Sequence, residues 1–181
     1  MYLDVFNKVV DSDDFTVGGG SASALAGAMA AGMASMVAKL SMAKPVNLTQ
    51  EEYTAMSKEL DELAQQDTEA YCMIKDAFAL PKSTDEEKEV RKQAVRDAAY
   101  QAALVPKNNG YNNKRVYELV CRLEGSSNPA CLSDLMSAKY LSESGVKGCV
   151  LNIQANLSMI KDEARTREME EAMEDLGKGM M

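Results

Sequence analysis

The chain has 181 residues, 46% of them hydrophobic, an ordinary size and composition for one compact domain with a filled core. Its net charge of −8 disfavours nucleic acid and anionic membrane surfaces as partners, because both require a concentrated basic patch and the sequence shows none. Aromatic residues make up only 6%, tryptophan is absent and there are 13 methionines, so we predict an all-α fold of closely packed helices in a single domain, 1–181.

A glycine-rich loop is the first informative feature along the chain. Residues 3–10 predict a short helix, which the polar residues 11–14 end, and a second helix is expected over residues 21–42. The backbone N–H groups at the start of this second helix would point over the loop that precedes it. Candidate donors to an anionic ligand are therefore Gly18, Gly19, Gly20 and Ser21. An ordinary turn before a helix is the alternative interpretation.

The chain shows no feature that predicts export, a membrane span or a metal site. The second helix is long enough to cross a bilayer, but its many Gly, Ala and Ser residues make it weakly hydrophobic and suit close packing in a core. The N-terminus lacks a basic stretch followed by an apolar segment, so a cytoplasmic location is expected. Histidine is absent and the four cysteines form no CxxC pair, so no metal site is expected.

The third and fourth helices are bounded by capping and breaking residues. Residues 49–52 read as a capping box at the start of a third helix, which should run to Leu80 and break at Pro81 and Lys82. Ser83 or Thr84, with Glu86 or Glu87, should cap a fourth helix. We predict that this helix ends at Val105, before Pro106, and that residues 108–110 form a turn.

The C-terminal third predicts several shorter helices. A fifth helix over residues 113–123 should be followed by Asn128 as N-cap and Pro129 as the first residue of a sixth helix, which carries Asp134. Gly145 is expected to separate it from a seventh helix, 146–159, and residues 161–181 should form a solvated final helix or a tail. The whole chain is thus expected to be a compact bundle of about six to eight helices.

A carboxylate interrupts the apolar face of the third helix. The apolar residues of this face recur at helical spacing, and the position between Leu63 and Ala70 is Asp67, with Tyr71 one turn further on. A buried acid requires partners, so Asp67 either belongs to a functional site or is hydrogen-bonded to a neighbouring helix.

Two further polar groups have equally open interpretations. Asn152 and Asn156 lie four residues apart on one helix face, where two amides can bind a heterocycle or tie helices together, and the structural role is favoured on residue types alone. Asp134, flanked by Ser133, can act as an acid–base group or simply stabilise the start of its helix.

Five motifs occurring in order give the chain a family resemblance. They are the run from Val17 to Met29, residues 80–88, Val105-Pro106, residues 128–134 and Asn152-Ile-Gln-Ala-Asn156-Leu. Together they resemble the formiminotetrahydrofolate cyclodeaminase and methenyltetrahydrofolate cyclohydrolase family over roughly residues 1–165. Two positions depart from the family pattern, which often has Pro in place of Val17 and a hydrophobic residue in place of Lys107.

The resemblance implies a fold, a substrate and a set of site residues. It implies an all-helical, dimer-forming enzyme of cytoplasmic one-carbon metabolism, including histidine degradation, that binds a tetrahydrofolate derivative as substrate in a groove near the glycine loop. Asp134 is the first candidate for the catalytic acid–base group and Asp67 the second, because the chain has no histidine. Carried over from the motifs, the substrate-binding residues are Gly18, Gly19, Gly20, Ser21, Lys82 (for a carboxylate), Ser133, Asn152 and Asn156.

Three functions follow from this resemblance and remain open. Cyclodeamination of 5-formiminotetrahydrofolate to 5,10-methenyltetrahydrofolate with release of ammonia is the first, and hydrolysis of the methenyl compound to 10-formyltetrahydrofolate is the second. A helical bundle that binds folate or a partner helix without turnover is the third. The sequence contains no formiminotransferase domain, so a formiminotransferase partner would be a separate protein.

Overall fold

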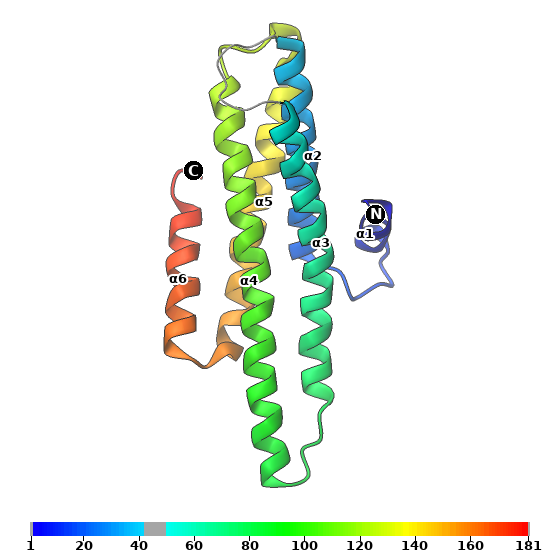
Figure 1. The fold of residues 1–181 in the computed structure, drawn as a ribbon, viewed down its shortest axis with the longest axis vertical. Coiled ribbons are helices and arrows are strands. Elements are labelled where there is room, and N and C mark those ends of the chain that lie inside the picture. Colours follow the sequence, from blue (N-terminus) through cyan, green and yellow to red (C-terminus); the bar gives the residue numbers. More distant parts are fainter. Residues whose placement is uncertain (1, 42–49, 181) are drawn as a thin grey trace.

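The computed structural model describes residues 2–41 and 50–180, and these residues form helices joined by short loops, without a β-strand (Figure 1). The helices are α1 (Tyr2–Val10), α2 (Gly19–Ser41), α3 (Gln50–Ala79), α4 (Asp85–Leu123), α5 (Leu132–Ile160) and α6 (Glu163–Gly177), with a short 3₁₀ helix, η1, at Pro129–Cys131. The predicted all-α bundle is confirmed. The long helices α2 to α5 lie side by side, α1 packs against α2 and α3, and α6 lies outside α4 and α5.

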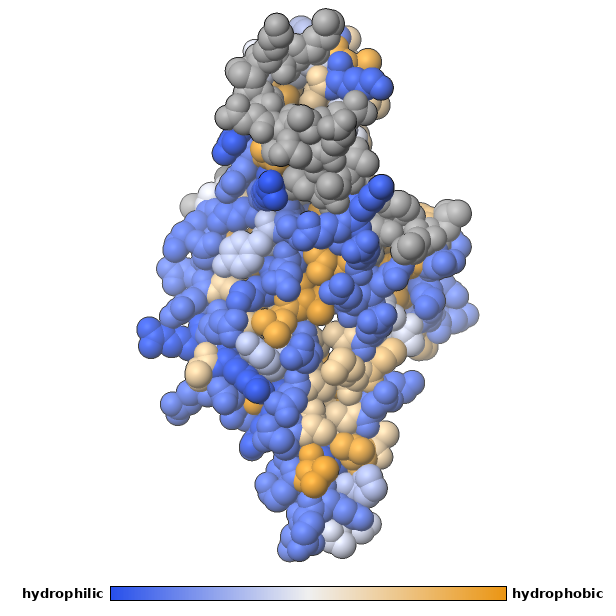
Figure 2. All heavy atoms as spheres, in the orientation of Figure 1, coloured by the Kyte–Doolittle hydropathy of each residue, from blue (hydrophilic) through white to orange (hydrophobic). Residues whose placement is uncertain are grey.

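The helix α2 is the central element of the bundle. It contacts α3, α4 and α5, and its small residues, among them Ala24, Ala30 and Ala34, are fully buried at these contacts. By length and hydropathy α2 would also suit a membrane span, and 61% of its most apolar window is buried inside the bundle. The face of the molecule shown in Figure 2 is mainly hydrophilic, with apolar side chains gathered along the lower halves of α3 and α4.

The helix α4 continues through Pro106, where the sequence predicted an end and then a turn at residues 108–110. Proline has no N–H to donate, which leaves the carbonyl of Ala102, four residues earlier, without its usual helical partner. The side chain of Asn156 on α5 donates to this carbonyl at 3.2 Å. The break was therefore wrongly predicted, because a neighbouring helix supplies the donor that proline lacks.

The helix α5 likewise continues through Gly145, which the sequence placed between two helices. A Cβ atom at Gly145 would lie only 2.0 Å from the amide oxygen of Asn113, and one at Gly27 only 2.3 Å from the same atom. Asn113 is fully buried on α4 and donates to the carbonyl of Ser23 at 3.3 Å. Gly145 thus makes room for a buried amide between three helices and is not a helix terminator.

The predicted caps are confirmed where the structure describes them. Thr84 and Glu87 form a capping box at the start of α4, and Asn128 accepts a hydrogen bond from the backbone of Ala130 at the start of η1. The capping box predicted at residues 49–52 lies outside the described residues, because Thr49 is not described.

The C-terminal segment was expected to be a solvated helix or a tail, and α6 differs by packing one face against the bundle. Met169 and Leu176 are fully buried there, with Ile153 and Ile160 of α5 in the same apolar cluster.

Candidate functional site

A pocket of about 130 Å³ lies where the glycine loop meets α3 and α5. Three groups predicted from the sequence line it together: Gly18 and Gly19 at the start of α2, Asp67 on α3, and Asn152 and Asn156 on α5. The remaining lining residues come from the loop before α2, from α3 and from α4: Phe15, Thr16, Val17, Tyr71, Ile74 and Ala102.

The carboxylate of Asp67, a residue of α3, lies against the N-terminal end of α2, where the sequence predicted donors to an anionic ligand. Its carboxylate accepts a hydrogen bond from the Ser21 hydroxyl at 2.9 Å and another from the Ser21 backbone N–H. A Cβ atom at Gly20 would lie 2.0 Å from the Asp67 Oδ1 atom, so the absence of a side chain there lets the carboxylate approach the helix. The protein's own carboxylate therefore takes up the donors around Ser21, and a ligand would meet the outer part of the loop at Gly18 and Gly19.

The surroundings of Asp67 favour its neutral form. Burial raises the pKa of the Asp67 carboxyl above its ordinary value, while the hydrogen bonds from the side chain and backbone of Ser21 lower it in part. The neighbouring Cys149 thiol on α5 has a raised pKa as well, chiefly through burial and then through the nearby Asp67. Asp67 is thus a carboxyl group whose environment suits it to hold and release a proton.

Asn152 and Asn156 contribute to both packing and the pocket. The Asn156 amide donates to the carbonyls of Ala102 and Asn152, and the Asn152 amide donates to the carbonyl of Gly148. The structural role predicted for this pair is therefore present. Because the two N–H bonds of Asn156 are used in this way, its amide can offer a ligand only its acceptor oxygen.

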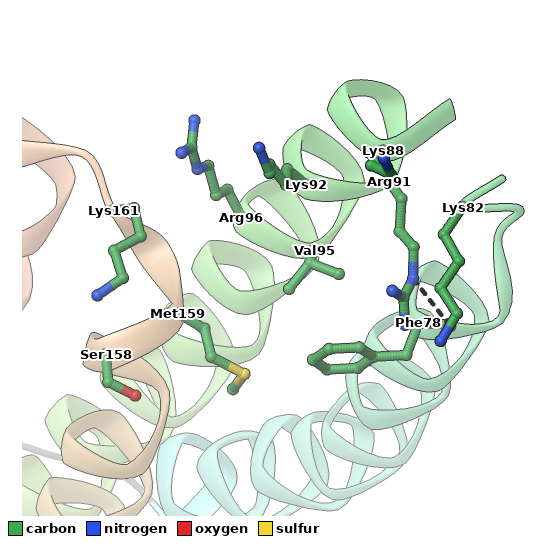
Figure 3. Close-up of a pocket in the computed structure, with 10 residues that line it drawn as sticks. All are labelled: Phe78, Lys82, Lys88, Arg91, Lys92, Val95, Arg96, Ser158, Met159 and Lys161. Atoms are coloured by element: carbon green, nitrogen blue, oxygen red, sulfur yellow. Dashed lines mark hydrogen bonds between the residues drawn. The ribbon is translucent and has the colours of Figure 1, made fainter. Parts of the chain in front are cut away.

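A second, larger cavity of about 430 Å³ lies between α4, the end of α3 and the end of α5 (Figure 3). Phe78, Val95 and Met159 form its apolar surface. The cavity is also lined by cationic side chains, which are Lys82, Lys88, Arg91, Lys92, Arg96 and Lys161.

These cations differ in whether a carboxylate lies nearby, and Arg96 interacts electrostatically with Glu89 without forming an ion pair. Lys88 pairs with Asp85 and Lys92 with Glu89, while Lys82, Arg96 and Lys161 form no ion pair with another described residue. The Arg91 guanidinium lies 5.6 Å from the centre of the Phe78 ring and donates to the Phe78 carbonyl, which fixes the aromatic side chain at the cavity wall. The fold therefore assembles a basic patch in a chain of net charge −8, although the sequence showed none.

The two cavities follow one another along the same helices. Ile74 on α3 lines the smaller pocket, and Phe78, one turn later, lines the cationic cavity. On α5, Asn156 lines the smaller pocket, and Ser158, two residues later, lines the cationic cavity. Seven residues separate Tyr71 from Phe78, which corresponds to about 10 Å along α3. A single elongated molecule can therefore place one end beside Asp67 and an anionic end among the cations.

The structure does not bring Asp134 or Ser133 to this site. Both lie in the first turn of α5, and Asp134 precedes Asn152 by eighteen residues, or about 27 Å along the helix axis. Of the two carboxylates predicted from the sequence, Asp67 lines the pocket and Asp134 does not.

Sequence reasoning missed most of the cationic cavity. It identified Lys82 but not Arg91, Arg96 or Lys161, which come from separate parts of the chain. A spacing of four residues from Lys88 to Lys92 and from Lys92 to Arg96 places all three on one face of α4, and this pattern was the available signal. For metal ions, the described part of the chain has no group of three acidic, Cys or His residues arranged to hold one.

The fold is all-helical, and it places a cavity lined by cationic side chains next to a pocket that contains a partly buried carboxyl group. The sequence model of the family called formiminotransferase-cyclodeaminase matches residues 2–175, so the chain belongs to this family. This confirms the resemblance predicted from the five motifs.

Individual relatives are similar over most of the chain. A methenyltetrahydrofolate cyclohydrolase from Methylorubrum extorquens is 30% identical over 182 residues, covering 96% of this chain and 88% of that protein. The formimidoyltransferase-cyclodeaminase of Mus musculus is also 30% identical, but the match covers 87% of this chain and 31% of the mouse protein. The chain therefore spans about a third of that relative.

A solved structure shares the fold. The crystal structure of a formiminotetrahydrofolate cyclodeaminase from Thermotoga maritima matches with a TM-score of 0.78 and 26% identity, covering 97% of this chain and 87% of that chain.

Proposed function

We propose that the protein is an enzyme of folate one-carbon metabolism that converts 5-formiminotetrahydrofolate to 5,10-methenyltetrahydrofolate with release of ammonia. The observation that carries the proposal is the placement of Asp67, a partly buried carboxyl group with a raised pKa, in a pocket next to a cationic cavity. Family membership and the similarity to a cyclodeaminase structure support the same conclusion.

The two cavities suit the two ends of a folate. The pteridine carries N–H donors, which the acceptor oxygen of Asn156 can bind beside the glycine loop. The glutamate carboxylates would lie among Lys82, Arg96 and Lys161, and the benzoyl ring would pack on Phe78, which is 48% exposed. In this arrangement N5 and N10, between which the one-carbon unit is transferred, lie near Asp67.

The reaction requires one proton to be moved within the pocket. N10 attacks the carbon of the protonated formimino group, forming the N10–C bond, and the proton that N10 then carries passes to the Asp67 carboxylate. Asp67 returns this proton to the amino nitrogen as the C–N bond breaks and ammonia leaves. The product is a delocalised cation, which the ionised carboxylate also stabilises as its charge develops.

Hydrolysis of 5,10-methenyltetrahydrofolate is the second candidate function. One observation favours it: the cyclohydrolase from M. extorquens is matched over 88% of its own length. In this reaction water attacks the methenyl carbon and gives up one proton to the Asp67 carboxylate. Asp67 returns this proton to N5 as the C–N5 bond breaks, and the hydroxyl of the adduct loses its proton to solvent as the formyl group of 10-formyltetrahydrofolate forms.

One experiment separates these functions. Purified protein is mixed with 5-formiminotetrahydrofolate in one cuvette and with 5,10-methenyltetrahydrofolate in another, and the near-ultraviolet absorbance of the methenyl group is followed. Absorbance that grows in the first with ammonia release supports cyclodeamination, and absorbance that decays faster than in buffer in the second alone supports hydrolysis. No change in either cuvette would contradict both and favour a bundle that binds without turnover.

We further propose that the chain forms a homodimer through α2. The exposed side of this helix carries Met29, Met36 and Leu40, which are 50%, 40% and 55% exposed. With Met33 they follow the alternating three- and four-residue spacing of a coiled-coil seam, which fits a second copy of the same helix.

A further inference from the structure

Ser21 is placed to interact with the proposed acid–base group in a way that depends on the proton. The side chain is fully buried at the start of α2. Its hydroxyl oxygen lies 2.9 Å from the Asp67 Oδ2 atom and 3.1 Å from the Ala64 carbonyl oxygen, one turn earlier on α3. The Thr68 hydroxyl is a more distant partner at 3.4 Å, and either of these two hydroxyls can be the donor. The Asp67 carboxylate and the Ala64 carbonyl are the two nearer acceptors, and a serine can donate to only one acceptor at a time.

The protonation state of Asp67 decides between the two acceptors. When Asp67 is ionised, the Ser21 hydroxyl donates to the carboxylate, a charge-assisted hydrogen bond. When Asp67 is protonated, its own O–H can donate to the Ser21 oxygen, and the Ser21 hydroxyl turns to the Ala64 carbonyl. Both arrangements use the same positions of the heavy atoms, so only hydrogens move.

We infer that Ser21 is a positioning residue that holds the Asp67 carboxyl group in one place in both its ionised and its protonated forms. This inference rests on the proposed role of Asp67 as the group that takes up and returns a proton. A carboxyl group that moved when it gained a proton would have to find its position again within each turnover, and a shift of about 1 Å can cost on the order of a hundredfold in rate.

Few groups other than Ser21 lie close enough to Asp67 to change its pKa. The titratable side chains around it are Tyr71 on its own helix, which lines the pocket, and Cys149 on α5, whose thiol is buried. From α2 and α4 the neighbours in the pocket and beneath it are uncharged, namely Gly19, Gly20 and Ala102. No lysine or arginine is among the described residues that line this pocket. Ser21 is therefore the main group that stabilises the ionised carboxylate.

The test compares Ser21→Ala with Ser142→Ala. Ser142 is also fully buried, but its hydroxyl bonds only to carbonyls of its own helix, Ala138 and Lys139, so it controls for the loss of a buried hydroxyl. Proteins labelled with ¹³C at aspartate carboxyl groups are titrated without substrate, and the Asp67 signal is the one absent from Asp67→Asn. Thermal unfolding and circular dichroism confirm that each variant is folded.

We expect the midpoint of the Asp67 titration to rise by about one pH unit or more in Ser21→Ala, a tenfold change in proton affinity, because a hydrogen bond to the charged form is lost. In Ser142→Ala the midpoint should stay that of the wild type. An unchanged midpoint in Ser21→Ala, or an equal rise in Ser142→Ala, would overturn the inference. Because no substrate is present, this outcome is independent of whether the proposed reaction occurs.

The pH–rate profile provides a second test, which links Ser21 to turnover. If Ser21 positions Asp67, the limb of the pH–rate profile that reports Asp67 should move in Ser21→Ala in the same direction as the titration midpoint, and kcat should fall more than KM rises. Ser21→Thr keeps the hydroxyl and should restore the wild-type midpoint. A Ser21→Thr protein that folds but titrates like Ser21→Ala would contradict the role of the hydroxyl.

Discussion

Replacing Gly20 by alanine should displace the Asp67 carboxylate while leaving the bundle folded. The added Cβ atom would lie 2.0 Å from the Asp67 Oδ1 atom and 2.5 Å from its Cγ atom, whereas ordinary contact begins at 3.4 Å. The carboxylate must therefore retreat by about 1.4 Å, from 2.0 Å to 3.4 Å. Such a movement breaks its hydrogen bond with Ser21 and should lower kcat on the order of a hundredfold.

The matched control for this substitution is Gly177→Ala at the end of α6. A Cβ atom at Gly177 meets nothing within 4 Å, so this variant should keep full activity and gain up to about 1 kcal/mol from the higher helix propensity of alanine. Steady-state kinetics with the methenyl absorbance and thermal unfolding measure both effects. A kcat of Gly20→Ala close to that of the wild type would contradict the prediction that catalysis depends on the position of the Asp67 carboxylate.

Three further predictions concern pH, the cationic cavity and assembly. Because the pKa of Asp67 is raised in the folded protein, its favourable contribution to stability is complete below the unfolded-state pKa and is lost as the pH rises through the folded-state pKa. The free energy of unfolding, measured with denaturant, should therefore increase in Asp67→Asn relative to the wild type as the pH is raised from 4 to 8. A difference in unfolding free energy between the two proteins that does not change with pH would contradict a raised pKa of Asp67. The double variant Lys82→Ala, Arg96→Ala should raise KM more than it lowers kcat. Added salt, or removal of the substrate's glutamate, should change the KM of this variant less than that of the wild type. Equal changes in KM for both proteins would place the glutamate elsewhere. Met29→Glu combined with Met36→Glu should convert a dimer to a monomer in light scattering, whereas Leu151→Glu, an exposed position on α5, should leave the dimer intact.

Part of the site was predictable from the sequence because its residues violate a local pattern. Asp67 interrupts an apolar helix face, and a buried carboxylate requires partners whichever role it has. The glycines around the start of α2 predicted donors to an anion, and the structure places the Asp67 carboxylate against Gly20. The resemblance supplied Lys82, Asn152 and Asn156, which the residue types alone did not place at one site.

The remaining features depend on contacts between helices that are distant in sequence. By local rules Pro106 predicts a helix end, and this prediction was wrong because Asn156, fifty residues later, donates to the carbonyl that proline leaves free. The sequence predicts a helix break at Gly145, but in the structure this glycine lies inside α5 and makes room for the Asn113 side chain. The cationic cavity joins α4 to residues after α3 and α5, so no single stretch of sequence shows it. Asp134 had the local features of an acid–base residue, and only the length of α5 separates it from the pocket.

The most direct test of the assignment of Asp67 is the turnover of Asp67→Asn beside Asp134→Asn, with whichever folate the wild type converts. Both substitutions remove one carboxylate and keep the size of the side chain, and circular dichroism checks that each variant is folded. We predict that Asp67→Asn lowers kcat by a factor on the order of 10² to 10⁴, while Asp134→Asn stays close to the wild type. The reverse result, with turnover lost in Asp134→Asn and kept in Asp67→Asn, would contradict the assignment of the catalytic site to the pocket at the start of α2.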